Sequence, residues 1–552
     1  MSGQQRADHN NLGRRPNRRN GNGAAGNGNG SAGVSGSVAA RPREQWSGQL
    51  GFIVSAIGSA VGLGNIWRFP GVAYENGGGA FLIPYLIALV TAGIPILFLD
   101  YAIGHRFRGS APTAFRRLGG RTGRWMESLG WFQVWICIII AVYYAAVIAW
   151  AASYFVFSFD LRWGVDTQTF FVSEFLQTSD PGFSAQFVPA VLIPLVLVWV
   201  TVLAVLAGGI AKGVQRANII FLPLLVVAFL ILVVRALFLD GAMTGLDALF
   251  TPDFAALADP NVWIAAYSQI FFSLSVAFGI MITYSSYRNR KANVTAPALV
   301  VAFANSSFEI IAGIGVFATL GFFAFQQGVG VDELEGITGV GLSFITFPAI
   351  VSQMPGGPLF GALFFGSLVM AGFTSLLSVL QVVSSAFQDK FSLSARQASL
   401  RVGTVLGVVS VLLFATTSGL VTLDTVDQWA NNVGIVVSAI ASTVLVMWVF
   451  RKGPELADHL NAVSTFRVGR VWQLLVGVLA PAVLLFMLIQ RIIVLVTEGY
   501  EGYPLWYLAV AGWGTIGVIL VGAIVFTVLP WRNDPDDFVP WPSTKAMKGA
   551  SK

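Results

Sequence analysis

The sequence predicts an all-α protein that crosses a membrane twelve times. Of its 552 residues, 55% are hydrophobic and only 11% are charged, whereas a soluble domain carries about 25% charged residues. Twelve apolar stretches are long enough to span a bilayer, which requires about 20 residues each. The first and the sixth stretch differ from the others because small and polar residues interrupt them. These three observations define a polytopic helical bundle with two broken helices.

The loops between the spans set the orientation of the bundle. The twelve spans are predicted near residues 50–70, 80–104, 130–158, 187–207, 213–239, 261–287, 294–325, 358–388, 400–418, 425–450, 471–495 and 505–530. With loops on alternating sides, most of the 33 Lys and Arg fall on the side of the two termini, and the exceptions are Arg68, Arg162, Arg235 and Arg491. Positively charged loops face the cytoplasm, so we expect a plasma-membrane protein with cytoplasmic N- and C-termini.

The two ends of the chain differ from the bundle in composition. Residues 1–42 are basic and rich in Gly and Asn, which predicts a disordered cytoplasmic tail because such a segment cannot bury apolar area. Its arginines would also suit nucleic acid or anionic lipid, but a solvated tail is the simpler interpretation. We therefore expect a core over 43–450, two further helices within 451–530, and a second cytoplasmic tail over 531–552.

The first predicted span contains the run from Gly58 to Pro70, where three glycines, an Asn, an Arg and a Pro stand in place of apolar residues. In lipid, each unpaired backbone N–H or C=O costs several kcal/mol. A broken helix is tolerated at that depth only where the freed groups line a cavity or bind an ion or a polar substrate. The run therefore predicts a binding site within the membrane.

The sixth predicted span repeats this anomaly between Gln269 and Gly279. The sixth span comes five positions after the first, an odd number, so the two broken helices run in opposite directions. This arrangement is typical of two inverted five-helix repeats with a binding site at their interface. We expect the repeats over about 43–240 and 261–450, with helices 11 and 12 outside them.

Five motifs in order resemble one protein family. They are Arg43-Glu44-Gln45-Trp46, the run 58–70, Glu75-Asn76-Gly77-Gly78-Gly79-Ala80-Phe81, Ile282-Thr283-Tyr284-Ser285-Ser286-Tyr287 and Ala371-Gly372-Phe373-Thr374-Ser375. From Arg43 to about Phe450 the chain resembles the neurotransmitter:sodium symporter family, in its bacterial amino-acid-transporting branch. The resemblance implies the leucine-transporter (LeuT) fold, two bound sodium ions, no organic cofactor, and uptake of an amino acid by alternating access.

The resemblance also implies the sodium ligands. Site one would be held by Ala60, Asn65, Ser273 and Asn305, together with the carboxylate of the substrate. Site two would be held by Gly58, Val61, Ala371, Thr374 and Ser375. Taken alone, the two asparagines would also suit a hydrogen bond between helices, and the hydroxyls of site two would also suit bonds within their own helix.

The substrate site would be built around the first break. The resemblance assigns it to Ala60, Leu63, Gly64, Ile140, Tyr144, Phe272, Ser275, Phe278, Ser375 and Val379. Gly62 stands where monoamine carriers of the family have an acid, which favours a substrate with its own carboxylate. The apolar lining indicates an aliphatic or aromatic side chain, with some breadth because apolar pockets discriminate weakly.

Charged residues near the helix ends are expected to form gates. By resemblance, Arg68 and Asp427 pair through water at the outer gate, above Tyr144 and Phe278. Arg43, Trp46, Tyr287 and Asp389 form the inner gate. Glu309 lies one helical turn after Asn305 and, by resemblance, would take the place of the chloride that animal members bind near Tyr85, Gln269, Ser273 and Asn305. We therefore expect chloride independence, with a proton bound or released at Glu309.

Alternative functions differ in what they require of the sequence. A channel would need a continuous polar stripe, and a sensor would bind an amino acid without turnover. A carrier of another carboxylate-bearing amine, such as a GABA-like compound, would use the same cradle. An enzyme is not indicated, because the three histidines lie in tails or inner loops. The expected partners are a small amino acid, sodium and the bilayer, with no nucleic acid; the oligomeric state is left open.

Overall fold

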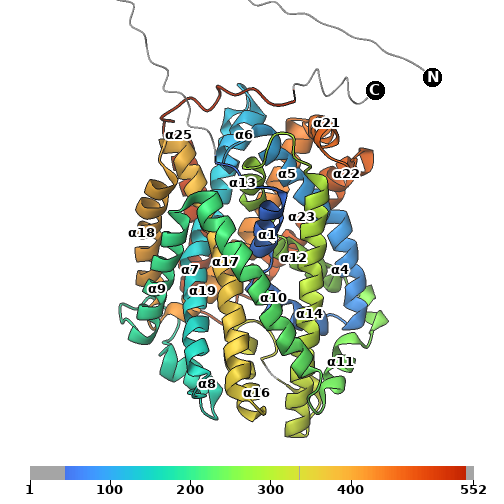
Figure 1. The fold of residues 1–552 in the computed structure, drawn as a ribbon, viewed down its shortest axis with the longest axis vertical. Helices are drawn as coiled ribbons and strands as arrows, with labels where there is room; N and C mark the ends of the chain where they lie inside the picture. Colours follow the sequence, from blue (N-terminus) through green and yellow to red (C-terminus); the bar gives the residue numbers. More distant parts are fainter. Residues whose placement is uncertain (1–43, 335, 543–552) are drawn as a thin grey trace, which may run out of the picture. The chain divides into compact units, whose positions relative to one another are not determined.

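The computed structural model describes residues 44–334 and 336–542, and over these ranges the chain is helical with no β-strand. Figure 1 shows the bundle, with α6 and α21 at one end and α8 and α16 at the other. The expected N-terminal tail and Arg43 lie outside the described residues. The helices named below are α1 (Gln49–Ala60), α2 (Leu63–Trp67), α3 (Phe69–Glu75), α4 (Leu82–Ala88), α5 (Ile94–Phe107), α6 (Ala111–Gly119), α7 (Glu127–Phe157), α8 (Thr167–Thr169), α9 (Pro189–Leu206), α10 (Arg216–Ala236), α11 (Ala242–Phe250), α12 (Pro260–Ser273), α13 (Ile280–Ser286), α14 (Thr295–Gln327), α16 (Phe347–Gln353), α17 (Gly357–Phe391), α18 (Ala395–Phe414), α19 (Gly419–Trp429), α20 (Val436–Val444), α21 (Gly453–Val463), α23 (Ala480–Thr497) and α25 (Gly514–Val528).

The membrane-spanning helices follow the predicted spans. Ten helices of the described chain are long and apolar enough to cross a membrane, and the pair α1 and α2–α3 forms an eleventh span with a bend of 55°. Helices α12 and α13 occupy the sixth predicted span, on either side of a break. The short helices α6, α11, α16 and α21 lie between spans and were not predicted, because the sequence analysis searched only for spanning stretches.

The interior of the bundle is built on α7 and α17, which pack along each other. Most of their side chains are buried, whereas α9, α10, α18, α23 and α25 expose large aliphatic side chains. Helices with an apolar exposed face are suited to lipid rather than to water. The chain is therefore a multi-pass membrane protein of the predicted all-α class.

The first break lies at Val61 and Gly62, where the backbone leaves the helical conformation. The side chain of Asn65 closes the break, because its Oδ1 accepts a hydrogen bond of 2.8 Å from the Gly62 amide. Helix α2 begins directly after the break and ends near Arg68. The break therefore exposes backbone groups inside the bundle, as the glycines of this run predict.

The second break spans residues 274–279, and its backbone is held by side chains from three other helices. Asp100 on α5 accepts a 2.9 Å hydrogen bond from the Ala277 amide. Gln133 on α7 and Ser438 on α20 donate to the Ala277 carbonyl over 3.0 and 2.5 Å. Ala277 has a φ of 65°, a left-handed conformation that costs a non-glycine residue about 1–2 kcal/mol. These contacts fix a backbone shape that the local sequence alone disfavours.

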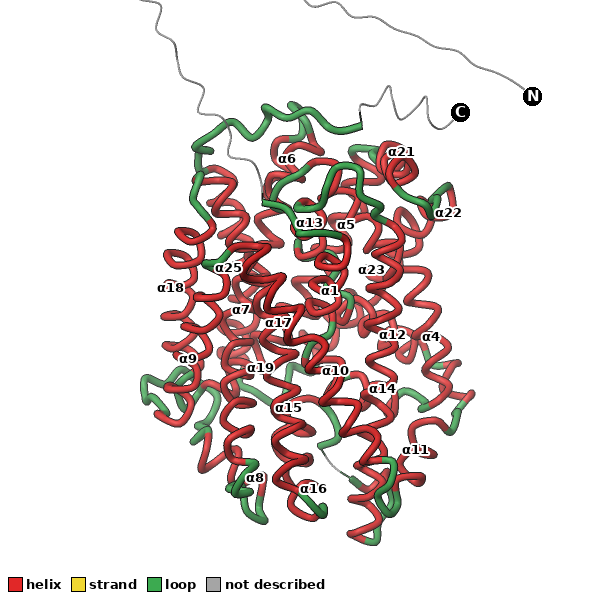
Figure 2. Tube along the Cα trace, viewed as in Figure 1, coloured by secondary structure: helices red, strands yellow, loops and turns green. Residues whose placement is uncertain are grey.

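The C-terminal segment 530–542 crosses the end of the bundle that carries α6 and α21, where Figure 2 shows it as a loop. Asp536 receives two hydrogen bonds from Arg116 on α6, of 3.0 and 3.2 Å, and pairs with Arg124 over 2.9 Å. The Trp531 indole donates to Glu127 over 2.8 Å, and Glu127 also pairs with Lys390 on α17. The segment thus joins α6, α7 and α17 at this end.

The contact with Arg116 makes docking of this segment dependent on pH. The hydrogen bond from Arg116, together with the charges of Arg116 and Arg124, lowers the pKa of Asp536 below its ordinary value. A lowered carboxyl pKa stabilises the docked state fully above the ordinary pKa, and this stabilisation is lost as pH falls through the lowered value. We expect the backbone amides of residues 531–542 to exchange their hydrogens faster below about pH 4, after correction for the intrinsic exchange rates.

The Asp536→Asn variant should reproduce this release at neutral pH, with faster tryptic cleavage after the exposed Arg532. Asp537→Asn, at an exposed neighbour, is the matched control and should cleave as the parent protein does. Equal cleavage of the Asp536 variant and the control would contradict the docking role of Asp536.

Candidate functional site

A small polar cradle lies at the first break. The Leu63 amide donates to the Tyr144 hydroxyl on α7 over 3.3 Å. A Cβ built on Gly62 would lie 2.9 Å from Ser375 Oγ and 3.3 Å from Tyr144 Oη. Gly62 therefore faces both hydroxyls, and the missing side chain leaves room beside the amides that start α2. Amides at a helix start favour an anionic group.

Apolar side chains lie one turn from the cradle on both central helices. Ile140 precedes Tyr144 by one turn on α7, and Val379 follows Ser375 by one turn on α17; both side chains are buried. Residues four apart share a helix face, so these two continue the cradle as an apolar surface. Phe278 is buried beside α7, where its carbonyl accepts the Cys137 thiol.

Phe272 covers the cradle from α12. A Cβ on Gly64 would lie only 2.4 Å from Phe272 Cε1, so the ring rests against this glycine. The Arg68 guanidinium carbon, one helical turn after Gly64, lies 4.7 Å from the centre of the same ring. The sequence analysis expected Tyr144 and Phe278 beneath the outer gate; Phe272 is the aromatic ring directly beneath Arg68.

Three of the expected ligands of sodium site one form a chain of hydrogen bonds. Asn65 Nδ2 donates to Asn305 Oδ1 over 2.9 Å, and Asn305 Nδ2 donates to Ser273 Oγ over 3.1 Å. All three side chains are buried, and Ala60 ends α1 just before the break. The structure thus brings oxygen atoms of α2, α12 and α14 together beside the cradle. The hydrogen bond that the two asparagines would make as ordinary helix contacts is also present.

The expected residues of sodium site two meet where α1 packs on α17. Ser375 Oγ lies 3.4 Å from the carbonyls of both Ser59 and Val61. Thr374 Oγ1 donates to the carbonyl of Ala371 within its own helix over 3.0 Å. Gly58 faces Thr374, because a Cβ built there would lie 3.7 Å from Thr374 Cβ. Neutral oxygens therefore gather here, the donor type that a hard cation prefers.

Glu309 is fully buried on α14, one turn beyond Asn305. The Gln269 amide donates to Glu309 Oε1 over 2.7 Å, and the Tyr85 hydroxyl donates to Oε2. These donors are the residues that the sequence analysis associated with chloride in animal members. The carboxyl group of Glu309 thus lies among the donors expected to surround an anion.

Of the two outer-gate residues, Arg68 lines a cavity, and Asp427 bonds to Asn431, which lines it too. Arg68 donates to Ser268 over 3.4 Å, and Asp427 accepts a 2.7 Å hydrogen bond from Asn431. In the described part of the chain the two charges form no direct ion pair. The cavity is lined by Arg68, Ser268, Phe271, Phe272, Asn431, Asn432, Ile435, Val436 and Met487. Phe272 therefore lines this cavity and also packs on Gly64 beside the cradle.

The inner-gate residues are closely packed. The Trp46 indole donates to the Tyr284 carbonyl over 2.9 Å, and its ring meets that of Tyr287 edge-on at 6.5 Å. Tyr287 Oη donates to Ser385 on α17 over 3.2 Å. Asp389 accepts hydrogen bonds from the Ser110 amide and the Thr113 hydroxyl. Arg43, the expected partner of Asp389, lies outside the described residues.

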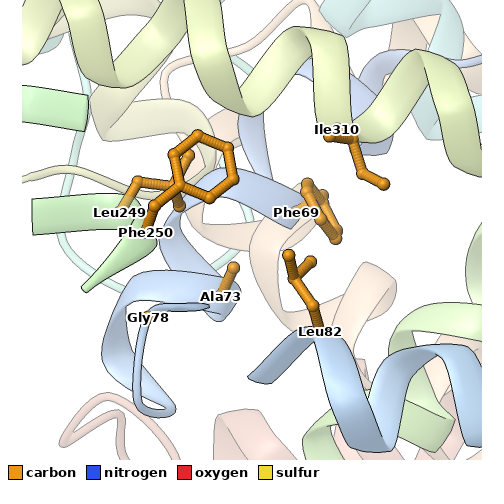
Figure 3. A pocket seen from close by; sticks show the side chains of 7 residues that line it. All are labelled: Phe69, Ala73, Gly78, Leu82, Leu249, Phe250 and Ile310. Atoms are coloured by element: carbon orange, nitrogen blue, oxygen red, sulfur yellow. The ribbon is translucent and has the colours of Figure 1, made fainter. Parts of the chain in front are cut away.

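A second cavity is lined by apolar residues (Figure 3), and no residue of the cradle is among them. It is lined by Phe69, Ala73, Gly78, Leu82, Leu249, Phe250 and Ile310. None of these side chains has a polar atom that would orient an amine, a carboxylate or an ion. Its contribution to the site is indirect, because Phe69 packs edge-on against Tyr85, the donor to Glu309.

Sequence reasoning missed several polar residues that position the site. Asp100, Gln133 and Ser438 hold the second break, and Asn218 on α10 lies buried beside Gly58. An acid in the second predicted span was a signal for Asp100, since charges in spanning segments are usually functional. The roles of the other three depend on partners far away in the chain, which one sequence does not reveal.

The geometry by itself defines a class of protein. Two broken helices meet at neutral oxygens, a polar cradle adjoins an apolar surface, and packed layers lie on both sides. This is the arrangement of a secondary transporter with a mid-membrane site. The sequence matches the sodium:neurotransmitter symporter family over residues 43–167 and 164–532, and the chain belongs to this family.

Individual relatives agree with this assignment. An uncharacterized sodium-dependent transporter of Methanocaldococcus jannaschii is 40% identical over 470 residues, covering 84% of this chain and 94% of the relative. The sodium- and chloride-dependent GABA transporter 2 of Homo sapiens is 30% identical over 509 residues, 84% of this chain and 83% of the relative. The crystal structure of MhsT in complex with L-phenylalanine matches with a TM-score of 0.68 and 32% identity, covering 81% of this chain and 99% of that one. The leucine-transporter fold class predicted from the sequence is thereby confirmed, and the protein is a sodium-dependent transporter.

Removal of the Asn65 side chain should destabilise the folded protein. Asn65→Ala leaves the Gly62 amide and Asn305 Oδ1 without their partners, at a cost of about 1–3 kcal/mol for each buried group. We expect a lower melting temperature in detergent, measured by the reaction of a thiol dye with buried Cys137, the single cysteine.

The matched control is Thr201→Val, which removes a hydroxyl bonded within its own helix on an exposed face of α9. If the Asn65→Ala protein has the same melting temperature as this control, the role of Asn65 in closing the break is contradicted.

Proposed function

We propose that the protein is a sodium-coupled symporter that imports a small neutral hydrophobic amino acid, aliphatic or aromatic, by alternating access. The observation that carries this proposal is the cradle at Gly62. Its open space adjoins two hydroxyls and the amides at the start of α2, and apolar side chains lie one turn away on both central helices. The hydroxyls and amides suit the carboxylate of a substrate, and the apolar side chains suit the side chain of a hydrophobic amino acid.

The substrate carboxylate binds at the amides of Leu63 and Gly64. Tyr144 accepts the Leu63 N–H through its oxygen and keeps its own proton, which it donates to the carboxylate. The amine faces the carbonyl of Ala60, the carbonyls near the end of α12, and the Ser275 hydroxyl. The side chain lies among Ile140, Phe272, Phe278, Ser375 and Val379.

Sodium couples to the substrate because the two share ligands. Site one consists of Ala60, Asn65, Ser273, Asn305 and the substrate carboxylate, so neither site is complete without the other. Site two consists of Gly58, Val61, Ala371, Thr374 and Ser375. Oxygen donors at both places support two sodium ions, since hard cations prefer such ligands.

Two gates give access to the site from alternate sides. Arg68, Asp427 and the ring of Phe272 close the outer side; Trp46, Tyr287, Asp389 and Arg43 close the inner side. The termini, α6 and α21 face the cytoplasm of the cell, because most of the Lys and Arg residues lie on that side.

A panel of labelled amino acids should distinguish the candidate functions. In proteoliposomes with an inward sodium gradient, we expect accumulation of Leu, Met or Phe, and none when potassium replaces sodium. Gly62→Ala should abolish uptake while melting as the parent does, because its methyl group fills the cradle.

Other outcomes of this experiment have defined meanings. Sodium-dependent binding without accumulation would support a sensor. Accumulation of GABA in place of hydrophobic amino acids would support the GABA-like alternative, which the human relative suggests. Sodium-independent flux would contradict both ion sites.

Transport should not require chloride. The carboxylate of Glu309 supplies a negative charge among Tyr85, Gln269 and Ser273 and takes the place of the anion. Replacement of chloride by gluconate should leave uptake unchanged, whereas Glu309→Ser, which removes the charge, should make uptake depend on chloride. A parent protein that loses uptake in gluconate would contradict this role, as would a variant that ignores chloride at full activity.

A further inference from the structure

Asn218 on α10 carries a buried amide oxygen without a hydrogen-bond donor. Its side chain is fully buried, and its Nδ2 donates to the Val214 carbonyl one turn earlier over 2.9 Å. Its Oδ1 receives no hydrogen bond from the described residues. A flipped amide would place the oxygen against the Val214 carbonyl, so the hydrogen bond fixes the orientation of Oδ1.

This oxygen points at Gly58. A Cβ built on Gly58 would lie 2.1 Å from Asn218 Oδ1, and the same position lies 3.7 Å from Thr374 Cβ. Asn218 Oδ1 therefore lies where α1, α10 and α17 meet, next to two residues of the proposed sodium site two. The missing side chain of Gly58 is what allows the oxygen to come this close.

Asn218 also lies toward the end of the bundle that carries α6. Three residues earlier, Gln215 accepts a hydrogen bond from the Ser47 amide, just before the start of α1. The described chain therefore places Asn218 between the packed layer at this end and the junction at Gly58.

A buried amide oxygen without a donor costs about 1–3 kcal/mol, and in a spanning helix water does not compensate for it. One compensation is a weak contact with the Cα–H of Gly58, worth at most about 1 kcal/mol. A cation compensates fully, because an amide oxygen is a ligand for hard cations. The oxygen is thus suited to a second role beside its structural one.

We propose that Asn218 Oδ1 is a sodium ligand of α10, at the edge of sodium site two nearest α6. This proposal rests on the proposed function. The bound ion ties α10 to α1 and α17, and its departure frees α10 from this junction. The oxygen receives the ion first on the way to the inner side, so Asn218 determines how tightly sodium is held there.

Sodium alone is the probe for this ligand. Sodium that binds only the folded protein raises its melting temperature by mass action, and the thiol reaction of Cys137 reports melting without any amino acid present. Titration with sodium, with potassium keeping the ionic strength constant, gives the half-saturating sodium concentration. For Asn218→Leu, which removes the oxygen at similar size, we expect this concentration to rise about tenfold, equivalent to about 1.4 kcal/mol.

Asn218→Asp keeps an oxygen and adds a negative charge, so we expect half-saturation at lower sodium, more so at higher pH. If the Leu variant does not fold, the Asp variant by itself tests whether residue 218 is a sodium ligand. Thr201→Val is the control for a polar-to-apolar change in a spanning helix. Its half-saturating sodium concentration should equal that of the parent protein.

Unchanged half-saturation in both Asn218 variants, with or without a change in melting temperature, would overturn the proposal and leave only the contact with Gly58. A parent protein that sodium does not stabilise at all would overturn the proposed ion sites themselves. The two failures are therefore distinguishable.

Discussion

The structure depends on one constraint, that backbone groups inside a membrane must find partners within the protein. Two helices of this chain break inside the bundle, at residues 61–62 and 274–279. At the first break the Asn65 side chain accepts a hydrogen bond from the Gly62 amide. At the second, Asp100, Gln133 and Ser438 share the two polar groups of Ala277. Both breaks are therefore held by side chains of the protein itself.

The same constraint links the parts of the site to one another. Asn65 closes the first break and also bonds to Asn305, which in turn bonds to Ser273 at the end of α12. A change at either break therefore reaches the other through three side chains. This connection gives a physical basis for coupling between an ion and a substrate that bind at the breaks, because each would reorganise the same hydrogen bonds.

The two proposed ion sites consist of neutral oxygens, and buried charged groups lie beside them. The buried carboxyl groups of Glu309 and Asp100 each receive hydrogen bonds at the edge of the site, while the Arg68 guanidinium lies beyond the ring of Phe272. At the α6 end, charged residues instead join the C-terminal segment to the bundle, where Glu127 pairs with Lys390 and Asp536 with Arg116. Charged groups thus lie around the neutral oxygens of the two proposed ion sites, and at the α6 end they join the C-terminal segment to the bundle.

The sequence by itself determined the membrane class, the positions of the spans, and the two breaks at 58–70 and 269–279. It did so because the bilayer requires long apolar stretches and makes each interruption costly, so the signal is local in the chain. Only the tertiary structure decided which side chains satisfy the breaks and surround the ions. Asp100 meets Ala277, Asn218 meets Gly58 and Asp536 meets Arg116. These pairs lie far apart in sequence, and packing of the helices, rather than any local pattern, brings their atoms together.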